Sequence, residues 1–237
     1  MGDAVEYAPG LWLRGVVPPL RLADFRVAAF DMDSTLISIE CVDEIADWAG
    51  RKAEVAAITE AAMRGEIADY KESLRRRVAL LKGVPEAALL AVYEQRLRLN
   101  PGVERFVGAC KSAGLHTLLV SGGFTFFSDR VRDRLGIDET RSNVLEIANG
   151  ALTGRMVDQP WGDICDGAEK RRTLLEACAR LRAEPARALA VGDGANDLPM
   201  MEAAGLSIAF HAKPAVRARA NIAITQGGLD RALEILR

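Results

Sequence analysis

Short apolar runs recur along the chain, and each of them ends in residues that favour a turn. The runs cover residues 26–30, 116–120, 188–191, 206–210 and 221–224. Runs of this length that are apolar throughout are typical of strands buried on both faces of a parallel sheet. The pattern therefore predicts five such strands.

Longer segments with a helical spacing of apolar residues lie between these runs. They include residues 103–112, 126–135, 170–181 and 197–204. Alternating strands and helices are typical of an α/β fold in which helices cover both faces of the sheet. We therefore expect a doubly wound, Rossmann-like parallel sheet with right-handed crossovers.

Residues 40–99 break this alternation, because they are helical in character and follow the first strand directly. The segment is far longer than the dozen or so residues that a crossover needs. Asn100-Pro101-Gly102 marks the return to the sheet. We expect a helical cap at 40–99, inserted into an α/β core made of residues 25–39 and 100–237.

Two other segments also depart from the alternation. In residues 144–157, Asn149-Gly150 stands between apolar stretches, which is a strong signal for a β-hairpin with a type I′ turn. Residues 1–24 are interrupted by prolines, and we expect them to form an irregular N-terminal arm.

The composition excludes several classes of partner. The 237 residues carry 31 Lys and Arg against 33 Asp and Glu, and this net charge of −2 gives no sign of affinity for nucleic acid or an anionic membrane. There is no uninterrupted apolar stretch of ~18 residues that would predict a membrane span. The four cysteines form no C-x-x-C pair and only two histidines are present, which argues against a zinc site. We expect a cytoplasmic protein with reduced thiols.

A pair of aspartates directly follows the first predicted strand. They lie in the stretch Asp31-Met32-Asp33-Ser34-Thr35. A carboxylate at the end of a strand can attack phosphorus and form an acyl phosphate. A second carboxyl group two residues later can protonate the leaving oxygen and then activate water. The alternative is a loop whose acids are solvated or close an Asx turn.

A second acidic turn, residues 192–197, follows the third predicted strand. Its sequence is Gly-Asp-Gly-Ala-Asn-Asp, and two acids with an amide suit a hard cation such as Mg²⁺. A dinucleotide-binding loop would require a small residue where Asp197 stands. A plain turn that caps the next helix is the other alternative.

Two more features are of a kind that binds anions. Ser121-Gly122-Gly123, between a strand and a helix, supplies a hydroxyl and backbone N–H groups. Lys170 lies near the start of its helix, where a positive charge opposes the helix dipole. An anion bound there would explain its presence. The alternative for residues 121–123 is a simple glycine turn, and the alternative for Lys170 is a solvated surface lysine. Ligands of open α/β sheets bind outside the carboxyl ends of the strands, so we expect all these loops to converge on one pocket.

Five stretches resemble the haloacid-dehalogenase superfamily of phosphatases, and the likeness runs from about residue 26 to the last residue. They are DMDSTL at 31–36, CVDEIA at 41–46, SLRRRVALLKG at 73–83, VSGGF at 120–124 and VGDGANDLPM at 191–200. The two stretches in the cap are similar to those of members that act on phosphoserine. The resemblance implies a haloacid dehalogenase-type fold and a Mg²⁺-dependent phosphomonoesterase. Its reaction would be hydrolysis of L-phosphoserine to serine and phosphate, the last step of serine biosynthesis.

The resemblance also implies a role for each site residue. Asp31 would be the nucleophile that becomes an aspartyl-phosphate, and Asp33 the acid and base. The metal ligands would be Asp31, Asp193 and Asp33, the last through its backbone carbonyl. The residues implied for holding the phosphoryl group are Ser121, Gly122, Lys170 and Asn196, with Asp197 in support.

In the cap, the resemblance implies that Glu40 pairs with the substrate ammonium and Arg77 with its carboxylate. The chemistry agrees, since a pocket selective for phosphoserine needs one acid and one bidentate base. Successive residues of a helix point in different directions, so Arg75, Arg76 and Arg77 cannot all face one pocket. The resemblance is what selects Arg77.

Other functions share parts of this chemistry. A phosphotransferase to another alcohol, such as homoserine, would use the same intermediate, and the sequence separates it poorly from a phosphatase. A receiver-type signalling module would explain an aspartate beside Mg²⁺. It would not explain the second carboxyl group of Asp33 or the helical cap. A nucleotide binder lacks a complete fingerprint. We expect a small phosphate ester as the substrate, and a monomer or homodimer.

Overall fold

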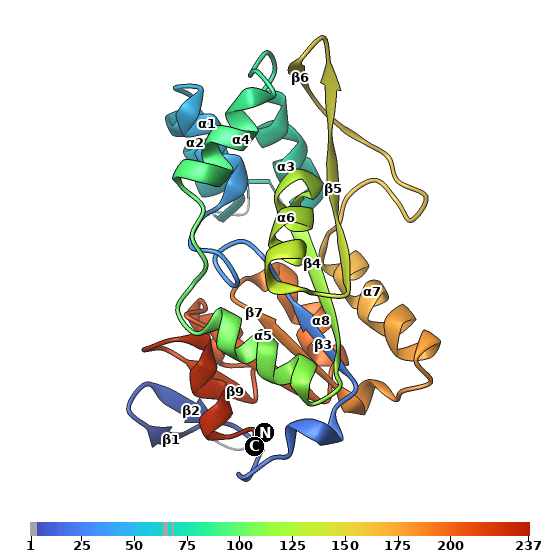
Figure 1. The fold of residues 1–237 in the computed structure, drawn as a ribbon. Coiled ribbons are helices and arrows are strands. Elements are labelled where there is room, and N and C mark those ends of the chain that lie inside the picture. The colour runs from blue at the N-terminus through green and yellow to red at the C-terminus, as the bar shows by residue number, and fades with distance from the viewer. Residues whose placement is uncertain (1–3, 64–65, 68) are drawn as a thin grey trace.

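The computed structural model describes residues 4–63, 66–67 and 69–237, without the side chains of residues 62 and 63. Within these residues the chain forms one nine-stranded sheet in the order β1-β2-β9-β8-β7-β3-β4-β5-β6 (Figure 1). The strands are β1 (Val5–Ala8), β2 (Leu11–Leu13), β3 (Val27–Phe30), β4 (His116–Phe124), β5 (Glu139–Ala148), β6 (Ala151–Val157), β7 (Ala188–Gly192), β8 (Leu206–Phe210) and β9 (Ile222–Ile224).

The helices separate the strands in the order expected from the sequence. They are α1 (Cys41–Trp48), α2 (Lys52–Met63), α3 (Tyr70–Ala79), α4 (Ala87–Gln95), α5 (Val103–Ser112), α6 (Thr125–Leu135), α7 (Gly167–Arg180), α8 (Leu198–Ala203) and α9 (Pro214–Arg217). Short 3₁₀ helices are η1 (Leu22–Asp24), η2 (Pro185–Arg187), η3 (Ala195–Asp197) and η4 (Leu229–Glu234). None of the helices in the described part of the chain has the length and hydrophobicity to cross a membrane.

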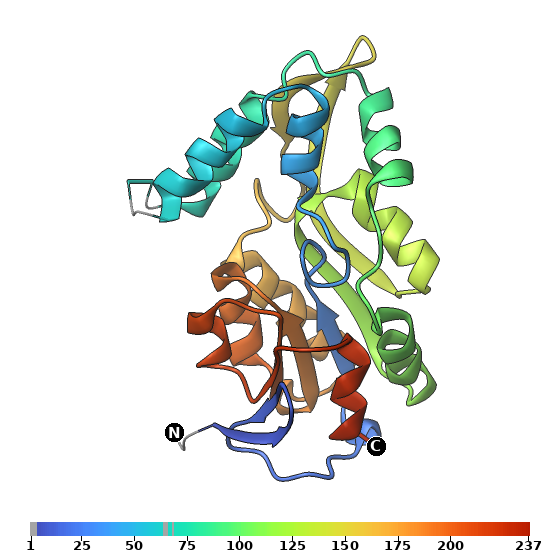
Figure 2. The ribbon, with the colours of Figure 1, turned by 90° about the vertical axis from the view of Figure 1, so that its left-hand side faces the viewer.

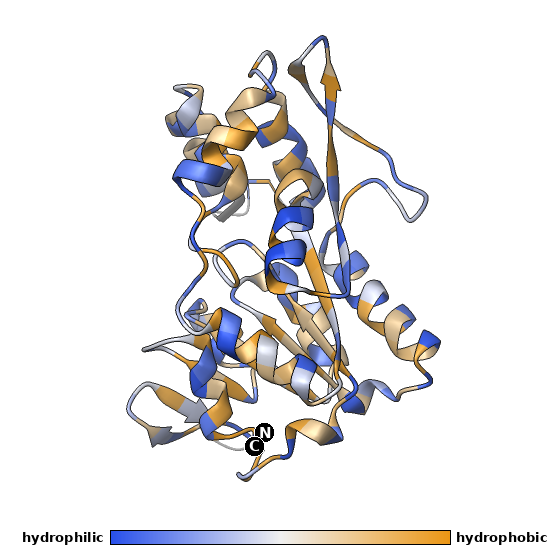
Figure 3. Cartoon of the chain, in the orientation of Figure 1, coloured by the Kyte–Doolittle hydropathy of each residue, from blue (hydrophilic) through white to orange (hydrophobic). Residues whose placement is uncertain are grey.

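The central strands are parallel and buried on both faces. The parallel pairs run from β9 through β8, β7, β3 and β4 to β5. Alternate residues of a strand face opposite sides. Phe30 packs edge to face on Phe106 of α5, at 6.2 Å between ring centroids, whereas Ala29 lies in the opposite core with Leu174 of α7. Hydrophobic residues follow these strands in Figure 3. The doubly wound α/β prediction is confirmed.

Helices α1 to α4 arch over one end of the sheet (Figure 2), and together with Glu40, the residue directly before α1, they are called the cap from here on. The predicted hairpin is formed by β5 and β6, and its turn residues Asn149 and Gly150 have φ of 53° and 75°, as a type I′ turn requires. Its tip joins the cap, because Gly83 and Leu152 are linked by a backbone hydrogen bond of 2.8 Å, and Leu152 donates another to Val84. The sequence boundary at residue 99 stays a prediction.

The N-terminal residues are more regular than the sequence indicated. Strand β2 pairs antiparallel with β9, with Leu11 opposite Ile224, and β1 pairs with β2. The prediction of an irregular arm over residues 1–24 is therefore wrong for these strands, because Leu11 and Leu13 gain burial by extending the sheet. Residues 1–3 of that arm lie outside the described residues.

Asn100 fixes the turn that follows the first aspartate pair. Its side-chain amide donates to the carbonyl oxygens of Ser34, Thr35 and Ile37 at 3.2, 2.9 and 3.0 Å. Its backbone N–H also donates to the carbonyl of Leu36 at 2.9 Å. One side chain therefore holds the exit from the cap against the entry to it.

Asn100→Asp should lower the free energy of unfolding by about 1–3 kcal/mol, because a carboxylate would face carbonyl oxygens that lose their donor. The measurement is urea unfolding followed by circular dichroism. Asn149→Asp, at the exposed hairpin turn, is the matched control and should stay within about 0.5 kcal/mol of the parent. Equal effects of the two substitutions would contradict this role of Asn100.

Candidate active site

A cavity of about 560 Å³ lies where the carboxyl ends of β3, β4 and β7 meet the cap. Its wall includes eight of the site residues proposed from the sequence: Asp31, Asp33, Glu40, Arg77, Ser121, Gly122, Asp193 and Asn196. The remaining two, Lys170 and Asp197, are fully buried next to it. The prediction that the strand-end loops converge on one pocket is thus confirmed.

Lys170 is the centre of a buried ion-pair cluster. Asp166 caps α7 by accepting a hydrogen bond from the Glu169 N–H at 2.9 Å, so the helix begins just before Lys170. The Lys170 Nζ donates to Asp31 Oδ1 at 2.5 Å and to Asp197 Oδ1 at 2.6 Å. The alternative of a solvated surface lysine is wrong: Lys170 has no exposed surface.

Asp31, Asp193 and Asp197 form a group that could hold a metal ion. One carboxylate oxygen of each lies within 4.8 Å of the others. Burial raises the pKa of Asp31, and burial and the charge of Asp197 raise the pKa of Asp193 to about 6. Crowded, buried carboxylates are the oxygen donors that a hard divalent cation prefers, so the residues present fit such an ion.

Asp197 differs from the other two acids because its oxygens are already engaged. Its Oδ1 accepts from Lys170, and its Oδ2 accepts from the N–H groups of Asp193 and Gly194 at 3.0 and 2.9 Å. This arrangement shapes the 192–197 turn. These contacts are of the kind expected if Asp197 supports the site by holding Lys170 and the turn that carries Asp193.

The side chain of Asp33 is held at the first turn of α1. Its Oδ2 accepts the Cys41 N–H at 3.2 Å, and its Oδ1 accepts the Cys41 S–H at 3.1 Å. Burial and the charge of Glu40 raise the pKa of Asp33 to about 7. A carboxyl group whose pKa lies near neutrality can both give and take a proton, as general acid–base chemistry requires.

Residues 121–123 lie at the end of β4, where its pairing with β5 is interrupted by a bulge. The sequence placed them in a turn directly before a helix, but they continue the strand, and α6 begins two residues later. Ser121 Oγ accepts the Gly123 N–H at 2.8 Å, and the Gly122 carbonyl accepts from the Asn143 amide at 2.8 Å. The segment is therefore held rigidly beside the acids.

Two cap residues bring opposite charges to the cavity. Glu40 accepts a hydrogen bond from the Ser34 hydroxyl at 2.6 Å. Arg77 lines the same cavity, and its Nε is buried without a hydrogen-bond partner among the described residues. Its neighbours point elsewhere, because Arg75 pairs with Asp163 and Arg76 with Glu72 on the surface of α3.

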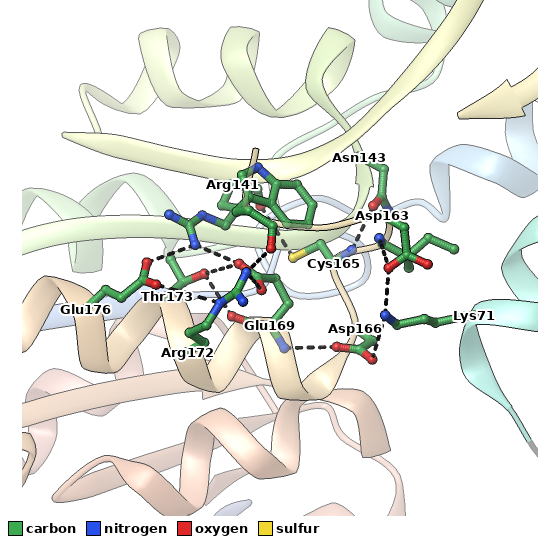
Figure 4. A network of polar contacts seen from close by, with 12 residues as sticks. Lys71, Arg141, Asn143, Asp163, Cys165, Asp166, Glu169, Arg172, Thr173 and Glu176 are labelled. Atoms are coloured by element: carbon green, nitrogen blue, oxygen red, sulfur yellow. Dashed lines mark hydrogen bonds and ion pairs between the residues drawn. The ribbon is translucent and has the colours of Figure 1, made fainter. Parts of the chain in front are cut away.

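Sequence reasoning missed several residues that hold or line the site. Thr35 donates to Asp193 Oδ1 at 3.1 Å and joins the two acidic turns. Asn143 Oδ1 accepts the Cys165 N–H at 2.8 Å, which ties β5 to the segment before α7 (Figure 4). Tyr70 and Lys213 also line the cavity. Thr35 was visible inside the acidic motif, whereas the others carry no local signal.

Comparison with known proteins identifies the family. The model of the haloacid dehalogenase-like hydrolases matches residues 28–202. A phosphoserine phosphatase of Polaromonas sp. is 70% identical over 232 residues, which cover 98% of each chain. One from Albidiferax ferrireducens is 71% identical over 228 residues, 96% of each chain. The chain belongs to the phosphoserine phosphatases of the haloacid dehalogenase-like hydrolases.

Solved structures of such phosphatases share the whole architecture. A phospho-aspartyl intermediate analogue of phosphoserine phosphatase is 35% identical, with a TM-score of 0.82, over 90% of this chain and 99% of that one. A substrate-bound phosphoserine phosphatase complex is 34% identical, with a TM-score of 0.80, over the same shares. The predicted family, fold class and enzyme class, a hydrolase, are confirmed.

In this phosphoserine phosphatase, Lys170→Met should lower the free energy of unfolding by about 3–5 kcal/mol, because Asp31 and Asp197 would lose their shared buried cation. Urea unfolding measures the change. Arg171→Met is the matched control on the same helix: Arg171 is exposed, and its loss should cost less than about 0.5 kcal/mol. A stable Lys170→Met protein would contradict the charge arrangement described above.

Proposed function

We propose that this chain hydrolyses L-phosphoserine to serine and phosphate through an aspartyl-phosphate on Asp31. One observation carries the proposal. A single cavity is lined by the acids after β3 and β7, by the end of β4, and by an acid and an arginine of the cap. The first group suits phosphoryl transfer, and the cap pair suits an ammonium beside a carboxylate.

In the first half of the reaction, Asp31 attacks the phosphorus and the serine oxygen leaves. Asp31 Oδ1 accepts from Lys170, which orients the carboxylate, whereas no described residue donates a hydrogen bond to its Oδ2. The Asp33 carboxyl group gives its proton to the leaving oxygen. Its pKa of about 7 leaves a large protonated fraction near neutral pH.

In the second half, Asp33 acts as a base. It takes a proton from the water that attacks the aspartyl-phosphate, which frees phosphate and restores the Asp31 carboxylate. Ser121, Gly122, Lys170 and Asn196 would hold the phosphoryl oxygens through both steps, and Asp197 would fix Lys170. Because the Cys41 thiol and N–H hold both Asp33 oxygens, the same carboxyl group is in place for both proton transfers.

Mg²⁺ would be held by Asp31, Asp193 and the backbone carbonyl of Asp33. When bound, the ion would neutralise charge on the phosphoryl oxygens and the buried carboxylates. The close approach of the Asp31 and Asp193 oxygens supports this assignment.

The cap would select the substrate. Glu40 would accept from the serine ammonium, and Arg77, whose buried Nε has no hydrogen-bond partner among the described residues, would donate to its carboxylate. We also propose a cytoplasmic enzyme, because its four cysteines are free, buried thiols that suit a reducing compartment. A monomer or homodimer stays the expectation for its assembly. The core of residues 25–39 and 100–237 would carry out the phosphoryl transfer, and the cap of residues 40–99 would select the substrate.

The purified chain should release phosphate from L-phosphoserine in the presence of Mg²⁺, and EDTA should abolish this. Asp31→Asn should lower kcat by several orders of magnitude, as expected for loss of a nucleophile. Asp24→Asn, an exposed acid seven residues earlier, is the control and should be fully active. Acid quenching during turnover should trap phosphate on Asp31. Phosphate on Ser121, or full activity without metal, would refute the mechanism.

Arg77→Ala should reduce kcat/KM for L-phosphoserine roughly 10- to 150-fold, the value of a hydrogen bond between charged groups. Phosphoethanolamine, which lacks the carboxylate, should be affected much less. Glu40→Gln should act in the same way on the ammonium, with phosphoglycolate as the insensitive ester. Arg76→Ala, on the surface of the same helix, is the control. Equal losses on all esters would show that Glu40 and Arg77 only hold the cap together.

A further inference from the structure

Tyr70, the first residue of α3, reaches from the cap to the end of β4. Its side chain lines the cavity. A Cβ atom added at Gly122 would lie only 2.0 Å from the Tyr70 hydroxyl oxygen. The hydroxyl therefore rests directly on the backbone of a residue proposed to hold the phosphoryl group.

The Tyr70 hydroxyl forms no hydrogen bond with any group in the part of the chain that the structure describes. Tyr70 is half-buried, and tyrosines in such positions usually find a hydrogen-bond partner for the O–H. Burial also raises the pKa of Tyr70 above its ordinary value, so the group stays a protonated donor. A donor of this kind at the wall of a cavity is suited to an acceptor that arrives with the ligand.

The charged groups around the Tyr70 hydroxyl indicate which part of a bound ligand would accept its hydrogen bond. The charges that act on the Tyr70 hydroxyl include those of Lys170, Arg77 and Asp31. The nucleophile with its lysine and the arginine of the cap are thus all near enough to the hydroxyl to act on it. Its contact with Gly122 puts it beside a residue that is proposed to hold the phosphoryl group.

Ion pairs next to Tyr70 join α3 to the segment before α7 (Figure 4). Lys71 Nζ lies 2.7 Å from Asp163 Oδ1 and 3.8 Å from Asp166, the residue that caps α7. Arg75 adds a second contact to Asp163 at 2.5 Å. Because α7 carries Lys170, the tyrosine and the lysine are placed by one connected framework.

We propose that the Tyr70 hydroxyl is a further phosphate-binding group that donates a hydrogen bond to a phosphoryl oxygen from the cap side. This rests on the proposed function only in that the phosphoryl group sits beside Asp31. It follows that the cap contacts the reacting group as well as the amino-acid part of the substrate.

Tyr70→Phe tests the proposal, because it removes the hydroxyl and keeps the ring. Titration calorimetry with inorganic phosphate and Mg²⁺ should show an affinity loss of roughly 10- to 150-fold, the range for a hydrogen bond to a charged group. The kcat/KM for both L-phosphoserine and phosphoethanolamine should fall, since both contain the phosphoryl group. Tyr93→Phe, on α4, where the ring lies 5.9 Å from the Arg130 guanidinium, is the matched control and should bind phosphate like the parent.

Phosphate binding needs no particular substrate, so the two proposals can fail separately. If the parent protein binds phosphate but does not hydrolyse L-phosphoserine, the proposed function fails, and loss of phosphate affinity in Tyr70→Phe still supports the inference. If Tyr70→Phe binds phosphate like the parent, the inference is overturned, whether or not the KM for L-phosphoserine rises. Thermal unfolding of Tyr70→Phe at the parent temperature would show that a binding loss reflects the hydroxyl alone.

Discussion

The buried ammonium of Lys170 between Asp31 and Asp197 is the interaction on which the rest of the site depends. Moving charged groups out of water costs several kcal/mol each, and only close opposite charges and hydrogen bonds offset that cost. Here three carboxylates lie together with a single ammonium, at 2.5 and 2.6 Å from two of them. This leaves a formal charge of −2. A divalent cation would balance this charge, and the buried lysine is in this way tied to the metal that the acids would hold.

The parallel sheet makes this concentration of charge possible. Parallel strands end at a common edge, so acids that are distant in the sequence meet there. Asp31 and Asp193 follow β3 and β7, which are hydrogen-bonded neighbours with Phe30 opposite Val191. Lys170 comes from α7, which packs on the face of the same two strands. The polar site is therefore built on strands that are themselves apolar and buried, and the rigidity of those strands fixes its geometry.

Much of this could be predicted from the sequence. Strand runs, helical spacing and the hairpin turn at Asn149-Gly150 depend on neighbours close in the sequence, and the structure confirms them. The arm was predicted wrongly because the pairing of β2 with β9 joins residues more than two hundred positions apart. Segment 121–123 looked like a turn because its glycines fit one, although a bulged strand uses them equally well.

The site shows the same division between local and distant information. Its acids stand in local motifs at strand ends, and Lys170, which Arg171 directly follows, was singled out by its place near the start of a helix. Only the fold shows that one of these neighbours is buried and the other exposed. Asn143 and Tyr70 lack any local signal, because each acts by touching a segment far away in the chain.

The contacts between cap and core would give the cap a part in the proposed chemistry as well as in selection. The first turn of α1 holds Asp33 through the thiol and N–H of Cys41, while Tyr70 at the start of α3 touches Gly122. Both contacts are made by residues at the N-terminal ends of cap helices. A movement of the cap away from the sheet would therefore loosen the proposed acid–base group and separate Tyr70 from the phosphoryl side together. The proposed set of groups would be complete only with the cap on the core, and this would link recognition of the amino-acid part of the substrate to assembly of the reacting centre.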